Sequence, residues 1–454
     1  MSIIGQTEDG KRRWVFAQSV KGRFQKLHRI SGWILMAILL GTPWINIGGQ
    51  PVLRMDLAGR RLFVVGATFT PHDAIFIVLI LLSLAFGLFF FTSLYGRMWC
   101  GYACPQTVFL EELIRPIEKL IQGDRSARKQ LASKRWSGEW WRKQLAVWAI
   151  YLALAVGLSL SLMGFFVDPR LLWTGGASTA AYGLTTFFAG TLFLDFAWFR
   201  EQFCIYLCPY ARFQGALTDD HSLNVMYRVS VSEPRATSRQ RKAEPEVQHG
   251  ACIDCKKCVV VCPTGIDIRD GFQLECIGCA RCVDACTEVM LKVDNQPSLV
   301  QYSSVAAQQG QPSKKLRPRT FAYGGLLTAL SAAFFILLAG RHPIEANLNR
   351  MPGTLYTVDA DGWVRNTFFL QVTNNSGAEG PVPVQVDLRG LEGAELVMPS
   401  LELSSTESTR IPVVVRMPPS NDADRTRSFE LELSTDFDRV TVGGTFKSGT
   451  SEVN

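Results

Sequence analysis

Residues 252–263 read CIDCKKCVVVCP, and residues 276–286 read CIGCARCVDAC. Both stretches space three cysteines two residues apart and add a fourth cysteine after three more residues. The eight positions are Cys252, Cys255, Cys258, Cys262, Cys276, Cys279, Cys282 and Cys286. A tight loop with this spacing brings three thiolates together, while the fourth is left for another partner.

The repeated spacing predicts two [4Fe–4S] clusters in a bacterial ferredoxin-like α+β domain. In two-cluster ferredoxins the fourth cysteine of each run ligates the other cluster. We therefore assign one cluster to Cys252, Cys255, Cys258 and Cys286, and the other to Cys276, Cys279, Cys282 and Cys262. A pair of zinc sites is the alternative, but zinc ribbons use two CxxC pairs and not two matching four-cysteine runs. Thr287 replaces the usual Pro, which we expect to alter the following chain and not ligation.

Long apolar blocks on both sides of this domain indicate a membrane protein. Hydrophobic residues make up 47% of the 454 residues and charged residues only 19%. About 20 apolar residues are needed to cross a bilayer as a helix. Five segments meet this length approximately, and we predict five transmembrane helices at Ile30–Ile47, Ala74–Tyr95, Gln144–Val167, Ala180–Phe199 and Thr320–Gly340.

Lysine and arginine flank the apolar blocks unevenly, which predicts the orientation in a bacterial inner membrane. Basic residues concentrate before residue 30, in residues 96–143 and before the fifth span. The N-terminus and the cysteine runs are therefore expected in the cytoplasm, with residues after Arg341 in the periplasm. Arg54, Arg60 and Arg61 lie in an external loop and count mildly against this. The net charge of +7 follows from this bias and does not indicate nucleic-acid binding. Residues 1–29 lack the apolar core of a cleavable signal peptide.

The C-terminal part differs from the rest in its pattern. Segments such as Gly362–Val372 and Val382–Leu388 alternate apolar and polar residues, which predicts an antiparallel β-sandwich of about seven strands. We divide the chain into an N-terminal arm (1–29), a four-helix membrane domain (30–215), the cluster domain with linkers (216–319), a fifth helix (320–340) and a periplasmic domain (341–454). The linkers are expected at Ser232–Gln248 and Asn295–Pro318.

A second cysteine motif occurs twice at the predicted membrane edge. Residues 97–105 read RMWCGYACP and residues 200–209 read REQFCIYLCP, with cysteines at Cys100, Cys104, Cys204 and Cys208. Both copies follow an even-numbered span and so lie at the same membrane face. Cysteines at i and i+4 share one face of a helix. Such thiolates could bind Cu(I), zinc or an iron–sulfur cluster, act as redox dithiols, or simply pack.

With both motifs and the β tail in this order, the chain resembles the cytochrome c oxidase accessory protein family known as CcoG, FixG or RdxA. The resemblance extends to Leu355-Tyr356 and to residues 362–366, GWVRN, which open an immunoglobulin-like domain in that family. It implies reduction of Cu(II) to Cu(I) for assembly of cbb-type cytochrome c oxidase. Copper would be a substrate or transient ligand of Cys100, Cys104, Cys204 and Cys208. Oxidase assembly factors, copper chaperones or transporters, and a second copy of the chain are the expected partners; the electron donor is open.

Two other functions fit the same motifs. One is a quinol-oxidising membrane ferredoxin subunit of a respiratory chain, similar to those of nitrate respiration, although such subunits usually lack the β tail. The other is a redox sensor, which would need a separate partner because the sequence has no DNA-binding motif.

Overall fold

The computed structural model describes residues 12, 14–69, 73–293, 298–314, 316–340, 344–353, 355–374, 381–403, 408–418 and 426–448. The chain forms two compact units. The first contains Met1–Thr42 and Leu79–Ala332, and the second contains Pro43–Val78 and Ala333–Asn454. All twelve cysteines belong to the first unit, so the candidate sites are built within it.

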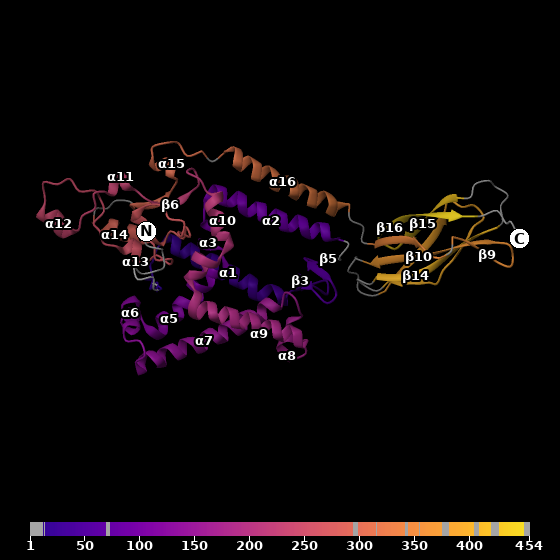
Figure 1. Cartoon of the computed structure of the whole chain (residues 1–454), viewed down its shortest axis with the longest axis horizontal. Coiled ribbons are helices and arrows are strands. Elements are labelled where there is room, and N and C mark those ends of the chain that lie inside the picture. Colours follow the sequence, from indigo (N-terminus) through magenta and orange to yellow (C-terminus); the bar gives the residue numbers. More distant parts are fainter. Residues whose placement is uncertain are drawn as a thin grey trace. The chain divides into compact units, whose positions relative to one another are not determined.

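Long helices form the membrane part of the first unit (Figure 1). Within the described residues, four helices are long and apolar enough to cross a bilayer. They are α2 (Ala74–Tyr95), α7 (Gly138–Met163), α9 (Thr179–Leu194) continued by the π-helical turn η4 (Asp195–Phe199), and α16 (Pro318–Ala339). They overlap four of the five predicted spans, which confirms a helical membrane protein.

The first predicted span, Ile30–Ile47, is wrong in its boundaries. The helix α1 runs over Arg23–Gly41, and Ile47 belongs to the short strand β1 (Asn46–Ile47). The 3-10 turn η1 (Thr42–Trp44) follows the helix and contains Pro43, which lacks an N–H and disfavours a longer α-helix. The apolar part of α1 is therefore about 18 Å long, well short of the roughly 30 Å hydrocarbon core.

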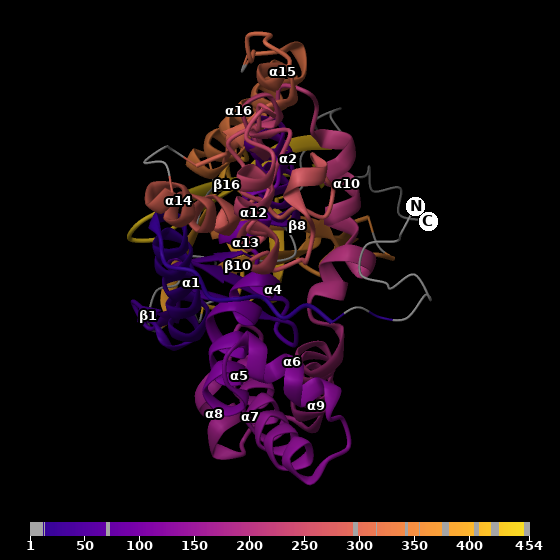
Figure 2. The ribbon, with the colours of Figure 1, turned by 90° about the vertical axis from the view of Figure 1, so that its left-hand side faces the viewer.

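The core of the membrane part lies between α1, α7, the end of α9 and an interrupted helix. That helix comprises α4 (Pro105–Val108), the π-helical η3 (Phe109–Ile114) and α5 (Arg115–Gln122). Ile114, Tyr151 and Phe196 are almost completely buried there. Ser159 on α7 donates a hydrogen bond to the Thr185 carbonyl on α9 at 2.6 Å. Figure 2 shows α5, α7, α8 (Pro169–Thr174) and α9 gathered together with α6 (Arg125–Ser133).

The cysteine runs lie in a small α+β domain. Strand β6 (Asn224–Tyr227) pairs antiparallel with β7 (Val300–Ser303), and α14 (Arg281–Val293) packs beside them. The domain also contains α11 (Val229–Ser232), α13 (Lys257–Val260), η6 (Ile268–Asp270) and α15 (Val305–Gln308).

Both predicted linkers contain secondary structure, which corrects the sequence reading. Strand β7 lies within Asn295–Pro318, and its Val300 is 1% exposed because pairing with β6 buries it. Helix α12 (Ser238–Ala243) lies within Ser232–Gln248 and begins with a capping box between Thr237 and Gln240. Four residues of strand are too few to give a clear alternation in sequence.

The second unit contains the predicted β-sandwich. One sheet has the order β12-β14-β10-β8 with β9 paired to β10, and the other has the order β13-β11-β15-β16. The strands are β8 (Ile344–Arg350), β9 (Thr357–Val358), β10 (Val364–Asn374), β11 (Val382–Arg389), β12 (Glu395–Val397), β13 (Leu401–Leu403), β14 (Ser408–Met417), β15 (Thr426–Ser434) and β16 (Arg439–Lys447).

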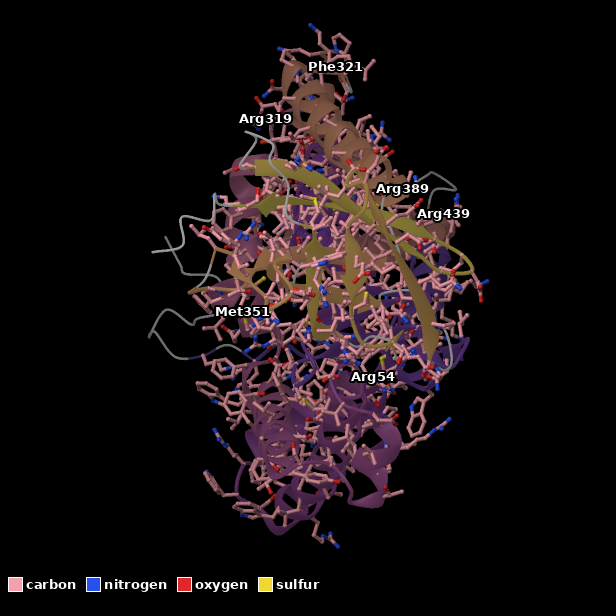
Figure 3. The ribbon with its side chains drawn as sticks, turned by 90° about the vertical axis from the view of Figure 1, so that its right-hand side faces the viewer. Arg54, Arg319, Phe321, Met351, Arg389 and Arg439 are labelled. Carbon is pink, nitrogen blue, oxygen red and sulfur yellow. The ribbon has the colours of Figure 1, made fainter. Side chains whose placement is uncertain are left out.

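Alternate side chains of these strands fill one core, as the pattern predicted. Phe368 and Leu370 of β10 meet Phe429 and Leu431 of β15, all at most 3% exposed. The sheets hold five and four strands in the described residues, more than the expected seven, because β9, β12 and β13 are too short to show alternation. Arg389 and Arg439 project from the surface (Figure 3). Residues 46–69 add two small sheets, β1-β2 (Gln50–Pro51) and β3-β4-β5 (Leu53–Asp56, Arg61–Val64, Ala67–Phe69).

Candidate functional site

Eight cysteines surround two separate cavities in the α+β domain. The residues around the first, cavity I, include Cys252, Cys255, Cys258 and Cys286. The residues around the second, cavity II, include Cys262, Cys276, Cys279 and Cys282, with Cys258 between the two. Each set combines three cysteines of one run with the fourth cysteine of the other, which is the division expected from the sequence. That these cysteines bind clusters remains a prediction, and their arrangement is consistent with it.

The backbone of the two runs repeats as closely as their spacing. Asp254 and Lys256, on either side of Cys255, have φ of 48° and 57°. Gly278 and Ala280, on either side of Cys279, have φ of 68° and 55°. Left-handed residues are uncommon outside glycine, and such turns aim successive N–H groups at one point. This concave set of donors suits an anionic cluster held by thiolates, which is an independent argument that the residues fit [4Fe–4S] groups.

Thr287 affects the chain after the last ligand, as expected. In the first run α13 ends at Val260, before Cys262 and Pro263, whereas in the second run α14 continues through Cys286 to Val293. Within α14, the Thr287 hydroxyl donates to the Val283 carbonyl at 2.8 Å. Proline at this position would have removed a backbone N–H from the helix. Threonine keeps it, so α14 extends beyond Cys286.

The loop of cavity II touches the first membrane-edge motif backbone to backbone. A Cβ placed on Gly101, in α3 (Met98–Tyr102), would lie 2.8 Å from the Ile277 carbonyl oxygen and 2.9 Å from the Cys279 nitrogen. Only glycine allows so close an approach. Cys100, Ile277 and Cys279 are packed together and are each no more than 7% exposed. The Cys100 thiol therefore neighbours a candidate ligand of the second cluster.

A buried ionic bridge fastens the same loop to the membrane part. Glu111 in η3 pairs with Arg281, which lies between Cys279 and Cys282, and with Arg115 of α5. Arg115 also donates to the Pro263 carbonyl at 2.8 Å. Burial would raise the pKa of Glu111, but the two guanidinium groups outweigh it and hold that pKa below its usual value. The bridge thus contacts both chain segments that surround cavity II.

The two membrane-edge motifs share one local structure. Cys100 lies in α3 and Cys204 in the π-helical η5 (Phe203–Leu207). Cys104 and Cys208 cap α4 and α10 (Pro209–Leu217) with extended backbones, φ −65° and ψ 126° against φ −70° and ψ 112°. Their N–H groups donate to the carbonyls five residues earlier, at 3.0 and 2.9 Å. The expectation of one shared helical face is wrong, because the proline after each second cysteine starts a new helix there.

The four membrane-edge cysteines form one neighbourhood. Burial, followed by the charges of Cys104, Cys100 and Cys208, raises the pKa of Cys204. Burial likewise raises the pKa of the Cys100 thiol to about 11. These mutual effects indicate that the two motifs lie close to each other. Among the described residues, however, no three His, Cys, Asp or Glu side chains converge closely enough to hold a single ion. The same holds for the eight cysteines around cavities I and II.

Polar side chains that sequence reasoning missed support Cys100. The Cys100 thiol donates to Oε1 of the fully buried Gln214 at 3.5 Å, and Nε of Arg97 donates to the same oxygen at 2.6 Å. Thr92 and Tyr210 form a hydroxyl pair nearby at 2.8 Å. Gln214 lies six residues after Cys208, outside any motif, so nothing in the sequence marked it.

The fold and these sites define a membrane-bound iron–sulfur electron-transfer protein. Three family models match in agreement with this class: "4Fe-4S binding domain" at residues 77–123, "4Fe-4S dicluster domain" at 199–305, and "IG-like fold at C-terminal of FixG" at 334–448. The chain belongs to the FixG/RdxA family.

Full-length relatives carry this assignment. Protein RdxB of Cereibacter sphaeroides is 36% identical over 446 residues, which cover 92% of each chain. Protein RdxA of the same organism is 34% identical over 86% of this chain and 85% of its own. The nitrogen fixation protein FixG of Rhizobium meliloti is 34% identical over 80% of this chain and 77% of its own.

Proposed function

We propose that the protein is a cupric reductase of the bacterial inner membrane, which converts Cu(II) to Cu(I) for assembly of a cbb-type cytochrome c oxidase. One observation carries the proposal. The buried Cys100 packs against Ile277 and Cys279 of the cavity II loop, so the membrane-edge thiols lie beside a candidate cluster. Electron transfer between the two sites then needs no movement of the domains.

Two bound [4Fe–4S] clusters would supply one-electron transfer along the α+β domain. Cys255 in the first set is exposed, whereas Cys279 in the second is 7% exposed and faces the membrane part. This arrangement favours electron uptake through either cavity and delivery from cavity II. Glu111, Arg115 and Arg281 hold the loop in place, and Gly101 sets the close approach.

The four membrane-edge thiols suit copper as a substrate. Soft thiolates prefer Cu(I) to Cu(II), so binding favours the reduced product. Each Cu(II) takes one electron, and a bound Cu(I) needs few ligands. Release would pass Cu(I) to a copper chaperone, a transporter or an oxidase assembly factor. With the orientation predicted from basic residues, this exchange takes place on the cytoplasmic side.

A single-turnover assay tests the proposal. Protein purified anaerobically is reduced with dithionite, freed of excess reductant and mixed with Cu(II), while a Cu(I)-specific chelator reports the product. We expect about two Cu(I) per chain, one for each reduced cluster. The variant Cys204→Ser/Cys208→Ser should keep its clusters and lose this yield. Reduced clusters that ignore Cu(II) would overturn the proposal.

A second reading of the four thiols is favoured by one comparison, because the matched region 77–123 described as a 4Fe-4S binding domain contains Cys100 and Cys104. The four thiols would then hold a third cluster and extend the electron path. Iron analysis separates the two readings. About eight irons per chain support a copper site, whereas about twelve, falling to eight in the Cys204→Ser/Cys208→Ser variant, support a third cluster.

A further inference from the structure

A groove of about 480 Å³ lies between α2 and α16 where both helices meet the α+β domain. Its apolar walls are Phe90 and Leu94 of α2 and Phe321 of α16, with Leu223 at its inner end. Gly325 opens the wall further, since a Cβ there would meet nothing within 4 Å. This volume falls within the roughly 300–1,000 Å³ typical of small-molecule sites.

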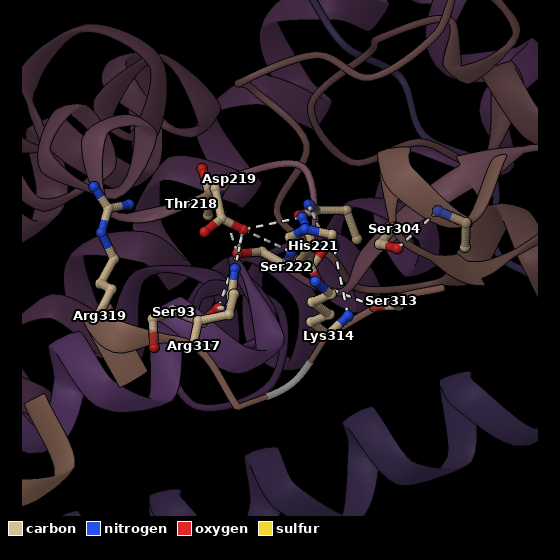
Figure 4. Close-up of polar contacts among 12 residues, drawn as sticks. Ser93, Thr218, Asp219, His221, Ser222, Ser304, Ser313, Lys314, Arg317 and Arg319 are labelled. Carbon is tan, nitrogen blue, oxygen red and sulfur yellow. Dashed lines mark hydrogen bonds and ion pairs between the residues drawn. The ribbon is translucent and has the colours of Figure 1, made fainter. Parts of the chain in front are cut away.

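The groove also has polar lining residues. They are Tyr95, the last residue of α2, and His221, Ser313 and Thr320. Figure 4 shows His221 close to Lys314, whose backbone N–H donates to Nδ1 of the ring at 3.5 Å. With Nδ1 accepting this bond, Nε2 is the ring nitrogen left to meet a ligand. The groove thus suits a ligand with a polar head and an apolar body.

The described lining residues include no fully charged side chain. The nearby guanidinium groups are engaged elsewhere. Arg317 pairs with Asp219 and donates to the Ser93 carbonyl at 2.5 Å, while Arg319 points away from His221 (Figure 4) and donates to the Ala216 carbonyl at 3.4 Å. Lys314 is exposed next to the lining residue Ser313 but does not itself line the groove. A phospholipid phosphate would need a cation within the lining. A neutral head is the better match for neutral hydrogen-bonding groups.

One segment of the chain connects the groove to both cysteine cavities. Leu223 lines the groove, Val225 lines cavity II and Tyr227 lines cavity I. Val225 and Tyr227 point to the same side of β6, and Leu223 comes just before the strand. Along the strand, Val225 and Tyr227 are about 7 Å apart, at 3.3 Å per residue. The lining of the groove and the lining of cavity II are therefore two residues apart along this segment.

We propose that this groove binds a membrane-soluble quinol, which is the electron donor of the protein. Phe90 and Phe321 hold its ring, and Nε2–H of His221 donates to a ring oxygen. Oxidation of the quinol to the quinone releases two electrons and two protons. One electron passes to each of the two clusters, and both protons pass to water. The electrons are then used in the proposed copper reduction. This inference rests on that function and identifies its electron donor.

Binding is tested directly on the full-length protein in nanodiscs. An azido derivative of decyl-benzoquinone, activated by light, should label peptides that contain Phe90–Tyr95 or Leu316–Gly325. Gly325→Trp fills the groove and should lower labelling on the order of tenfold. Ala322→Trp is the matched control, because Ala322 is exposed on the same helix and does not line the groove. His221→Phe should weaken binding about threefold to tenfold.

Electron transfer gives a second readout. Decyl-benzoquinol should reduce the clusters of the unaltered protein and of Ala322→Trp, but not those of Gly325→Trp. Dithionite should reduce all three equally, and the reduced Gly325→Trp variant should still convert Cu(II) to Cu(I), which separates this proposal from the previous one. Labelling that Gly325→Trp leaves unchanged, or a groove protected by an anionic phospholipid and not by the quinone, would overturn the quinol site.

Discussion

The two cysteine runs have the same spacing and the same backbone turns, yet their surroundings differ. Around Cys255, Lys256 and Lys257 face solvent, and Lys257 pairs loosely with Glu288 at 3.8 Å. Around Cys279, by contrast, Ile277, Ala280 and Arg281 are at most 5% exposed, and the loop is fixed to the membrane part by Glu111. The spacing of the cysteines decides which group a run can bind. The packing around the run decides whether that group lies near solvent or near the membrane part.

This difference assigns separate roles to the two cavities. Charges act more strongly in a buried environment than in water. Arg281 should therefore influence its cluster more than Lys257 influences the other, although each lies beside a cysteine. In the proposed electron path, cavity II would receive electrons from the groove and pass them to the membrane-edge thiols, and cavity I would hold the second electron.

Removing one cysteine ligand from each set should give the largest difference between the two cavities. We expect Cys279→Ser to abolish Cu(I) formation, because it removes the cluster beside Cys100. Cys255→Ser should retain about half of the single-turnover yield, since one cluster remains. Chelator-detected Cu(I) per chain measures both, with iron content as the control. Equal losses in the two variants would contradict separate roles.

Forcing the cavity II loop away from α3 should have the next largest effect. In Gly101→Val, side-chain atoms would overlap the Ile277 carbonyl, which lies 2.8 Å from the position of a Cβ. A displacement near 1 Å can slow a reaction by up to about a hundredfold. Stopped-flow mixing with Cu(II) measures the rate. Gly87→Ala is the matched control, because its nearest contact would be an ordinary 3.8 Å from Leu327. An unchanged rate in Gly101→Val would show that the contact is not on the path.

Breaking the ionic bridge tests why cavity II is fixed in place. Glu111→Gln leaves Arg115 and Arg281 buried without their carboxylate, which should cost about 3–5 kcal/mol of stability. Thermal melts followed by circular dichroism measure this at pH 7.

The same residue predicts a pH dependence. The pKa of Glu111 is lowered in the folded protein from its usual 4.5. Its stabilisation is therefore complete above that value and is lost as the pH falls through the folded pKa, since the unfolded chain binds the proton first. Melting temperatures should fall less in Glu111→Gln than in the unaltered protein as the pH is lowered below about 4.5. Parallel curves would assign the acid sensitivity to other groups.

Changing the exposed charge beside cavity I should have the smallest effect. Lys257 and Glu288 are 46% and 44% exposed, and such surface pairs contribute up to about 1 kcal/mol. Lys257→Gln should lower the reduction potential of its cluster less than Arg281→Gln lowers that of the other. Redox titration followed by electron paramagnetic resonance measures both shifts. A larger shift in Lys257→Gln would reverse our view of which cavity is protected from solvent.

Several features were predictable because they depend on local pattern. The apolar blocks became helices α2, α7, α9 and α16, and alternation marked strands such as β10 and β15. The errors fell where short elements depend on partners. Strand β7 was taken for a linker because only its pairing with β6 makes it a strand. Helix α1 was extended to Ile47 because hydropathy alone does not register the break at Pro43.

The sequence by itself determined the chemistry of this protein. Cysteine spacing defines which thiols can share a cluster, since ligand geometry is set by a few neighbouring residues. Apolar length likewise defines which helices enter the bilayer.

Only the tertiary structure decided which groups meet. It brought Cys100 and Cys104 beside Cys204 and Cys208 and set the loop of Cys279 against Gly101. It also paired Glu111 with Arg281, 170 residues away in the chain. Such contacts arise from close packing of whole side chains across distant segments, and no short stretch of sequence encodes them.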